Sequence, residues 1–179
     1  MEISALQKNL VGTRCEAEHF YESYFNEFPA IKAYLNNVKE TAKQTLETKT
    51  LFGRVRNFPM FRSKLPFMIA LAERTAVNAP IQGTAADIIK LAMVDMDAVI
   101  RAKDWQDVIF LTLQIHDEIV YQVPDHLTIE FGKVLDITME NVVKNHVNQI
   151  DQSVVKVLDI PITVSVEIGQ NLEDMKEMV

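Results

Sequence analysis

Cysteine, glycine and proline are scarce in this sequence of 179 residues, which contains one Cys, five Gly and six Pro. Because Cys15 is the single cysteine, an internal disulfide is excluded, and we expect a reducing, intracellular location. The few glycines and prolines, with no repeat and no low-complexity tract, argue against a long flexible linker.

Long hydrophobic runs are also lacking. Polar residues interrupt every apolar run before the roughly 20 residues that a membrane-spanning helix needs, so we expect no membrane partner. Hydrophobic residues still make up 48% of the chain, enough for one globular domain with a core. Basic residues are outnumbered 18 to 25, which gives a net charge of −7. Any nucleic-acid contact therefore needs a local basic face.

Two runs rich in Val, Ile, Leu, Phe and Tyr within 108–123 meet at His116, Asp117 and Glu118. This pattern predicts a β-hairpin whose tight turn carries the three polar side chains. The turn has no glycine, although tight hairpin turns favour Asn-Gly or Asp-Gly. Its two carboxylates suit a hard divalent cation such as Mg²⁺, which prefers oxygen ligands. Spacing alone leaves open the alternative of an ordinary polar turn.

Apolar and aromatic residues recur at helical separations in 16–46, with Pro29 in the middle. Because proline disfavours helix in the residue before it, the pattern predicts two helices that meet near Phe28 and Pro29. The segment 48–59 predicts a short extended segment or a hairpin. It begins the most basic region of the chain, which holds Lys49, Arg54, Arg56, Arg62 and Lys64. These cations are either ordinary surface or a phosphate-contacting patch.

Residues 66–102 predict a long helical stretch that is interrupted once, at 78–84 around Pro80. We expect Thr84 to cap the renewed helix, with Asp87 completing a capping box. Three hydrogen-bonding side chains spaced four residues apart would share one helix face: Arg74, Asn78 and Gln82. Amides both donate and accept, so this row suits base edges or sugar oxygens in one groove of a duplex.

The rest of the sequence completes an α+β domain. A helix is expected from Pro124 to about Val147, as a cover for the sheet, and a half-buried strand is expected at 160–169. This strand and the 108–123 hairpin should form one small antiparallel sheet packed by long helices. The tail at 171–179 is expected to be a last helical turn or to fray.

Three segments together resemble the carboxy-terminal part of the bacterial DNA polymerase I family, the family A DNA polymerases. They are TLFGR at 50–54, ERTAVNAPIQGTAAD at 73–87 and QIHDE at 114–118. The similarity covers nearly the whole chain. It implies the end of a fingers subdomain plus part of the palm. Residues 1–64 would be a remnant of the fingers helices with the basic hairpin, and 65–179 the palm portion with the His-Asp-Glu hairpin.

The resemblance also implies residue roles in nucleotidyl transfer from a dNTP to a primer 3′-hydroxyl. Asp117 would be the main ligand of two catalytic Mg²⁺ ions, Glu118 an accessory metal-binding acid, and His116 a contact of the primer strand. The residues that would contact primer-template DNA are Arg74, Asn78, Gln82, His116, Arg54, Arg56 and Lys64. The implied setting is DNA replication or repair at the nucleoid.

Two segments of the family pattern are not found in this sequence: a palm segment with a second essential Asp, and a fingers helix that binds the incoming dNTP. We therefore expect a fragment or split subunit that is inactive alone and needs an amino-terminal polymerase fragment as its partner. The surface facing that partner should be apolar, so the isolated chain is expected to self-associate as a homo-oligomer. The alternative is a non-catalytic remnant that binds DNA or a polymerase.

Overall fold

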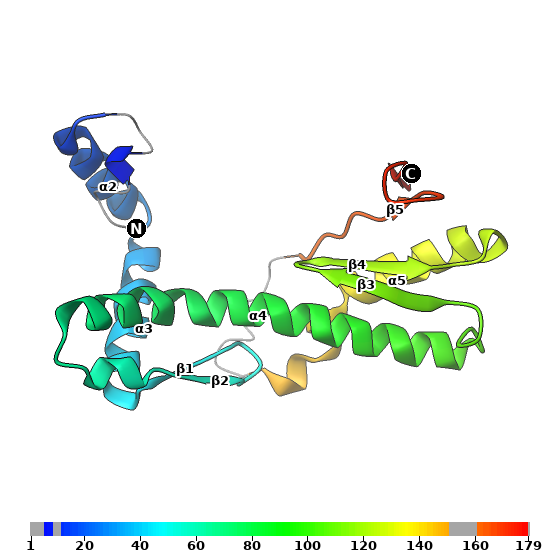
Figure 1. The fold of residues 1–179 in the computed structure, drawn as a ribbon, viewed down its shortest axis with the longest axis horizontal. Helices are drawn as coiled ribbons and strands as arrows, with labels where there is room; N and C mark the ends of the chain where they lie inside the picture. Colours follow the sequence, from blue (N-terminus) through cyan, green and yellow to red (C-terminus); the bar gives the residue numbers. More distant parts are fainter. Residues whose placement is uncertain (1–5, 9–11, 151–160, 179) are drawn as a thin grey trace. The chain divides into compact units, whose positions relative to one another are not determined.

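The computed structural model describes residues 6–8, 12–150 and 161–178. Their helices and small antiparallel sheets confirm the α+β class (Figure 1). By their contacts, the described residues of Met1–Thr48 and Asn57–Val77 form one compact unit, and those of Lys49–Arg56 and Asn78–Val179 form a second. The division expected at residue 64 concerns family subdomains and stays a prediction.

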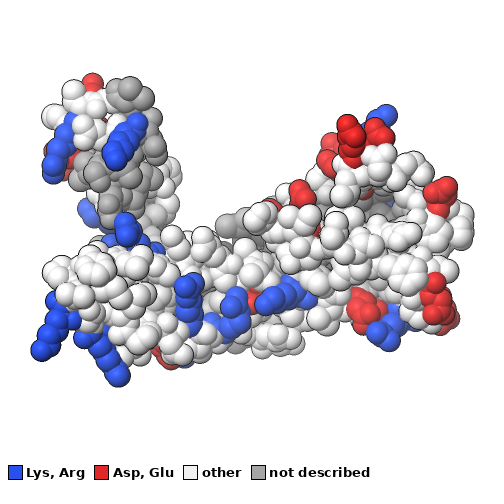
Figure 2. Space-filling view, in the orientation of Figure 1, with Lys and Arg blue, Asp and Glu red and all other residues white. Residues whose placement is uncertain are grey.

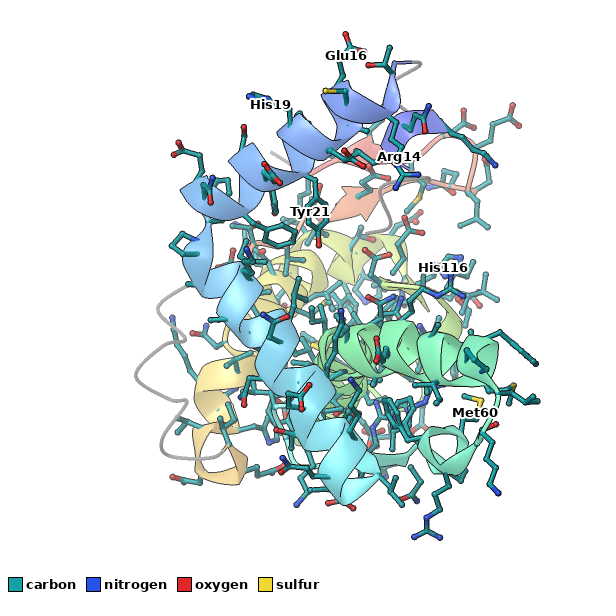
Figure 3. All side chains as sticks on the ribbon, turned by 90° about the vertical axis from the view of Figure 1, so that its left-hand side faces the viewer. Arg14, Glu16, His19, Tyr21, Met60 and His116 are labelled. Atoms are coloured by element: carbon teal, nitrogen blue, oxygen red, sulfur yellow. The ribbon has the colours of Figure 1, made fainter. Side chains whose placement is uncertain are left out.

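Two helices follow each other in the first unit, as the proline position predicted. α2 spans Arg14–Glu27 and α3 spans Pro29–Thr45. α2 begins at a capping box, in which the Thr13 N–H donates to Glu16 Oε2 at 2.7 Å and the Glu16 N–H donates to Thr13 Oγ1 at 3.3 Å. Glu16 is labelled on the first turn in Figure 3. The hydrogen bond from the Thr13 backbone lowers the pKa of Glu16.

The core of the first unit is built from small and aromatic side chains. Its buried residues include Ala17, Phe25, Ala42, Phe58, Ala72 and Ala76. Phe58 is fixed by its backbone N–H, which donates to Leu46 O at 2.7 Å. An ion pair of 2.9 Å between Lys43 Nζ and Glu73 Oε1 adds a polar link at the edge of this core.

Of the two alternatives expected over 48–59, a short extended segment or a hairpin, the structure has the hairpin. β1 (Glu47–Lys49) pairs with β2 (Val55–Asn57), and the 3-10 helix η1 (Pro59–Arg62) follows. Gly53 turns the chain between the strands with φ of 81°, a conformation that favours glycine.

α4 spans Pro66–Ala102 without a break, so the interruption expected at 78–84 is wrong. Pro80 lies inside the helix, where a proline removes one backbone hydrogen bond and costs about 3 kcal/mol. The buried alanines Ala76 and Ala79 lie in the helical turn just before this position. We attribute the continuity to their packing and to the high helix propensity of alanine, which offset the local cost.

The capping role expected for Thr84 and Asp87 is also wrong, because both residues lie inside α4. The Thr84 hydroxyl donates to Pro80 O at 2.6 Å and accepts from the Leu51 N–H at 2.9 Å. Asp87 accepts from Arg54 Nε at 2.7 Å. Both side chains therefore join α4 to a segment more than 30 residues earlier in the chain.

The second unit contains the predicted hairpin. β3 (Phe110–Ile115) pairs antiparallel with β4 (Glu118–Gln122), and the register shifts between Leu111 and Leu113. Thr112 lies at this bulge, and its hydroxyl donates to Val120 O at 3.0 Å.

The hairpin, α5 (Thr128–Glu140) and the end of α4 share one hydrophobic core (Figure 1). Its buried residues are Met96, Ile100, Ile109 and Phe131. The Phe131 ring packs edge-on against Tyr121 at 5.1 Å and against Trp105 at 6.2 Å between ring centroids. Phe131 thus connects the helix to the strand that follows the turn.

The helix expected from Pro124 to Val147 is present but broken into pieces: η2 (Asp125–Leu127), α5, α6 (Val142–Asn145) and η3 (Val147–Gln149). The break lies at Asn141, whose side-chain amide donates to Ile137 O at 2.8 Å. Such side-chain bonds compete with the helical backbone. Beyond the break, His146 Nε2 lies 2.8 Å from Asp95 Oδ1, which ties this segment to α4.

The last strand is shorter than expected and pairs differently. Only Glu167–Ile168 (β5) is strand among the described residues of 160–169, and residue 160 itself lies outside them. β5 pairs with Lys176–Glu177 (β6), so the expected joint sheet with the 108–123 hairpin is wrong, and so is the helical turn in the tail. Asn171 explains the reversal, because its Oδ1 accepts two backbone N–H groups at 2.9 and 3.1 Å.

On the face shown in Figure 2, Lys and Arg lie mainly over α2 and over the elements from β1 to the start of α4. Asp and Glu on that face lie mainly over the elements near the C-terminus and over the end of α4. None of the described helices combines the length and the apolar character that crossing a membrane demands.

Burial and the negative charge of Asp97 raise the pKa of Tyr121 to about 12. The unfolded phenol titrates near about 10, so the folded state keeps this proton longer than the unfolded state. The resulting stability is complete below about pH 10 and is lost as the pH rises through about 12. Urea unfolding across this window should show a steeper loss for the wild type than for Tyr121→Phe. Parallel curves would contradict the assignment.

Candidate active site

The His-Asp-Glu sequence lies where the hairpin reverses. Ile115 pairs with Glu118, so the loop consists of His116 and Asp117, while Glu118 is the first residue of β4. All three polar side chains are exposed at the tip, where His116 is labelled in Figure 3. The structure therefore brings the sequence-predicted catalytic residues together on a rigid two-stranded support.

His116 adopts φ of 52°, in the left-handed region. Two-residue hairpin loops require positive φ, which is why glycine or asparagine is common there. A non-glycine residue costs about 1 kcal/mol or more in this conformation. The Gln114 side-chain amide donates to His116 O at 2.7 Å and helps to hold the turn. A histidine therefore occupies a strained turn position that suits glycine or asparagine.

The carboxylates of Asp117 and Glu118 are hard oxygen donors, as Mg²⁺ prefers. They are sequence neighbours, with Asp117 in the loop and Glu118 at the start of β4. Within the part of the chain that the structure describes, no group of three or more His, Cys, Asp or Glu side chains could hold a metal ion. The two carboxylates could therefore supply some of the oxygen ligands of a Mg²⁺ ion, but they do not form a complete ligand set.

The polar row predicted on α4 lies on one face of a continuous helix. Arg74, Asn78 and Gln82 are all exposed, whereas Ala72, Ala76 and Ala79 on the neighbouring face are buried. Because Pro80 does not interrupt the helix, the four-residue spacing keeps the three side chains in register. Asn78 and Gln82, which both belong to the second unit, can present their amide groups together to one ligand surface.

The cations predicted to contact DNA differ in their surroundings. Arg56 on β2 and Lys64 before α4 are exposed. Arg54 is half exposed, but it is also held internally: its Nε donates to Asp87 Oδ1 at 2.7 Å and its Nη2 donates to Gly83 O at 2.9 Å. Sequence reasoning missed Asp87 as the partner of Arg54, because no local pattern links positions 33 residues apart.

The exposed carboxylates at the hairpin tip and the exposed polar side chains of α4 are candidate functional groups. Residues 1–174 match the sequence model of DNA polymerase family A. The chain belongs to this family, and the resemblance inferred from its three segments is confirmed.

Individual relatives agree with the family match. DNA polymerase I of Streptococcus pneumoniae serotype 4 is 40% identical over 139 residues, which are 78% of this chain and 16% of that protein. DNA polymerase I of Bacillus subtilis strain 168 is 36% identical over 171 residues, 96% of this chain and 18% of that protein. The chain thus spans less than a fifth of the length of these two curated relatives.

The fold has a close counterpart among solved structures. The POL domain of Pol1 from M. smegmatis, in complex with DNA primer-template and dNTP, superposes with a TM-score of 0.74 at 34% sequence identity. The match covers 79% of this chain and 24% of that chain. This similarity supports the fold class and the family assignment together.

The positive φ of His116 predicts a difference between two substitutions. His116→Val should lower the free energy of unfolding by about 1 kcal/mol relative to His116→Asn, because asparagine tolerates the left-handed region and a β-branched residue does not. Urea unfolding of both variants measures the difference. Equal stabilities would show that the turn relaxes to another conformation.

Proposed function

We propose that this chain supplies the carboxylate turn of a template-directed DNA polymerase, which transfers a nucleotide from a dNTP to a primer 3′-hydroxyl. The observation that carries the proposal is the pair Asp117 and Glu118 at the exposed tip of a hairpin, in a member of DNA polymerase family A. Replication and repair of intracellular DNA are the settings in which this reaction is used.

Asp117 is the proposed main ligand of Mg²⁺, with Glu118 as the accessory acid. The ions, when bound, supply activation of the primer 3′-oxygen and charge stabilisation of the leaving pyrophosphate. The remaining oxygen ligands come from a second palm aspartate and from substrate phosphates. We propose that this aspartate and the dNTP-binding fingers helix belong to an amino-terminal polymerase segment, on the same polypeptide or on a partner.

The exposed surface of β3 supports such an arrangement. All six residues of this strand are exposed, including Phe110, Leu113 and Ile115 at 43–48%. Among the described residues β3 pairs only with β4, so its other edge is available to a further strand. Apolar exposure of this kind favours a covering partner, or self-association of the isolated chain.

Primer-template DNA is the proposed macromolecular ligand. Arg74, Asn78 and Gln82 would contact the duplex in the minor groove, where the hydrogen-bond acceptors are nearly the same for every base pair. Such contacts sense the shape of a correct pair without reading sequence. His116 would contact the primer strand, and the cations that would contact the DNA backbone are Arg54, Arg56 and Lys64.

A second candidate function is non-catalytic binding to DNA or to a polymerase. The incomplete set of metal ligands among the described residues favours it. Binding without catalysis would be weak, sensitive to salt and independent of metal.

Primer extension with Mg²⁺ and all four dNTPs separates the two candidates. The chain is assayed alone and then with a fragment that supplies the rest of a polymerase I core. Extension only in the mixture supports the proposed polymerase function. Absence of extension in both assays, with a folded chain, favours non-catalytic binding, and extension by the chain alone contradicts the need for a partner.

Asp117→Ala should abolish extension in the complemented assembly while the chain stays folded, because an exposed turn carboxylate contributes little packing. Asp107→Ala is the matched control, since Asp107 is an exposed aspartate before the same hairpin. It should keep wild-type extension. Wild-type incorporation by Asp117→Ala would disprove the catalytic assignment.

Gln82→Ala should weaken use of the primer-template by the loss of one hydrogen bond, on the order of 1 kcal/mol, without changing the Mg²⁺ dependence. Titrating primer-template and Mg²⁺ separately in the extension assay measures both effects. Gln106→Ala, at another exposed glutamine, serves as the control and should change neither. A shifted Mg²⁺ requirement for Gln82→Ala would place this residue at the metal instead.

A further inference from the structure

The loop between β1 and β2 is docked onto α4 inside the second unit. Arg54 makes two of the bonds, through Nε to Asp87 Oδ1 at 2.7 Å and through Nη2 to Gly83 O at 2.9 Å. A third bond runs from the Leu51 N–H to Thr84 Oγ1 at 2.9 Å. The loop therefore rests on a single turn of the helix, from Gly83 to Asp87.

Asp87 is the buried anchor of this contact. Its side chain is only 10% exposed, and Oδ2 has no hydrogen-bond partner among the described residues. A carboxylate that is removed from water needs a compensating charge, and Arg54 supplies it. The pair therefore differs from the exposed pair of Asp97 and Arg101 on the same helix, where both side chains are more than half exposed.

Gly83 allows the loop to approach the helix closely. A Cβ at this position would lie 2.6 Å from Cγ2 of Thr50 and 3.2 Å from Nη2 of Arg54. Threonine is branched at Cβ and cannot move its methyl group away easily. A glycine in the middle of a helix costs stability, so its presence here is explained by the contact with the loop.

The docking site lies next to the proposed DNA-binding row. Gly83 directly follows Gln82, and the strands on either side of the loop carry the exposed cations Lys49 and Arg56. The contacts of the loop with Gly83 and Asp87 therefore fix the position of β1 and β2 relative to this part of α4. The β1–β2 hairpin thus places positive charge beside Gln82, in a chain whose net charge is negative.

We propose that Asp87 is a positioning residue for primer-template binding: through Arg54 it holds the basic β1–β2 hairpin beside Gln82, so that both elements engage one duplex. This inference rests on the proposed polymerase function. Asp87 touches neither the DNA nor the reacting atoms. Its loss should therefore raise the apparent Kd and KM for primer-template while kcat at saturating DNA is unchanged.

The first test compares Asp87→Asn with Asp97→Asn, which removes a carboxylate from the exposed pair. Anisotropy of a labelled primer-template gives Kd for the chain, and extension in the complemented assembly gives KM and kcat. Asp87→Asn should raise Kd and KM for primer-template roughly tenfold. This is the effect expected when the displaced hairpin loses one or two hydrogen bonds to the DNA. Asp97→Asn should match the wild type. An unchanged Kd for Asp87→Asn, or a fall in kcat alone, overturns the proposal.

A second pair of variants leaves every charge in place, which covers the case in which Asp87→Asn does not fold. Gly83→Ala should displace the loop and weaken DNA binding, although alanine favours the helix. Adding Thr50→Ser removes the clashing Cγ2 and keeps the hydroxyl that accepts from the Arg54 N–H at 3.1 Å. The double variant should recover binding. Failure to recover it, or wild-type binding by Gly83→Ala, overturns the proposal.

The outcomes separate this inference from the function on which it rests. If the wild-type chain neither binds primer-template nor supports extension with its complement, the proposed function itself fails. If the wild type binds and extends while Asp87→Asn and Gly83→Ala behave as the wild type does, only the positioning role fails.

Discussion

The continuity of α4 through Pro80 is the constraint on which the arrangement depends. A break there would separate Asn78 from Gln82 on the helix face. Because the helix continues, the row keeps its spacing, and Asp87 falls one helical turn beyond Gly83 on the side that meets the β1–β2 loop. The same helix then supplies Met96 and Ile100 to the core beneath the hairpin.

One strand of the hairpin, β4, packs against α5, whereas the other strand, β3, is exposed. Tyr121 on β4 packs against Phe131 of α5, which gives the turn a rigid base. β3, by contrast, exposes aliphatic and aromatic side chains to solvent. A surface of that character is costly for an isolated domain.

The positions of the individual charged side chains matter more for DNA binding by this chain than its net charge does. The net charge of −7 opposes a polyanion, so any affinity for DNA depends on where the minority of cations stand. The buried carboxylate of Asp87 provides that placement on α4, because it holds Arg54. Asp95, which is partly buried, likewise connects α4 to a distant segment through its 2.8 Å contact with His146.

Much of the secondary structure could be predicted from the sequence by itself, because it depends on residues that are close together in the chain. Pro29 marked the boundary between α2 and α3, alternating apolar runs marked the hairpin, and the His-Asp-Glu turn with its two companion segments identified the family. The incorrect expectations share another cause. Helix continuity at Pro80, the Arg54–Asp87 pair and the pairing of β5 with β6 were decided by tertiary packing, since each depends on which groups the folded chain brings together.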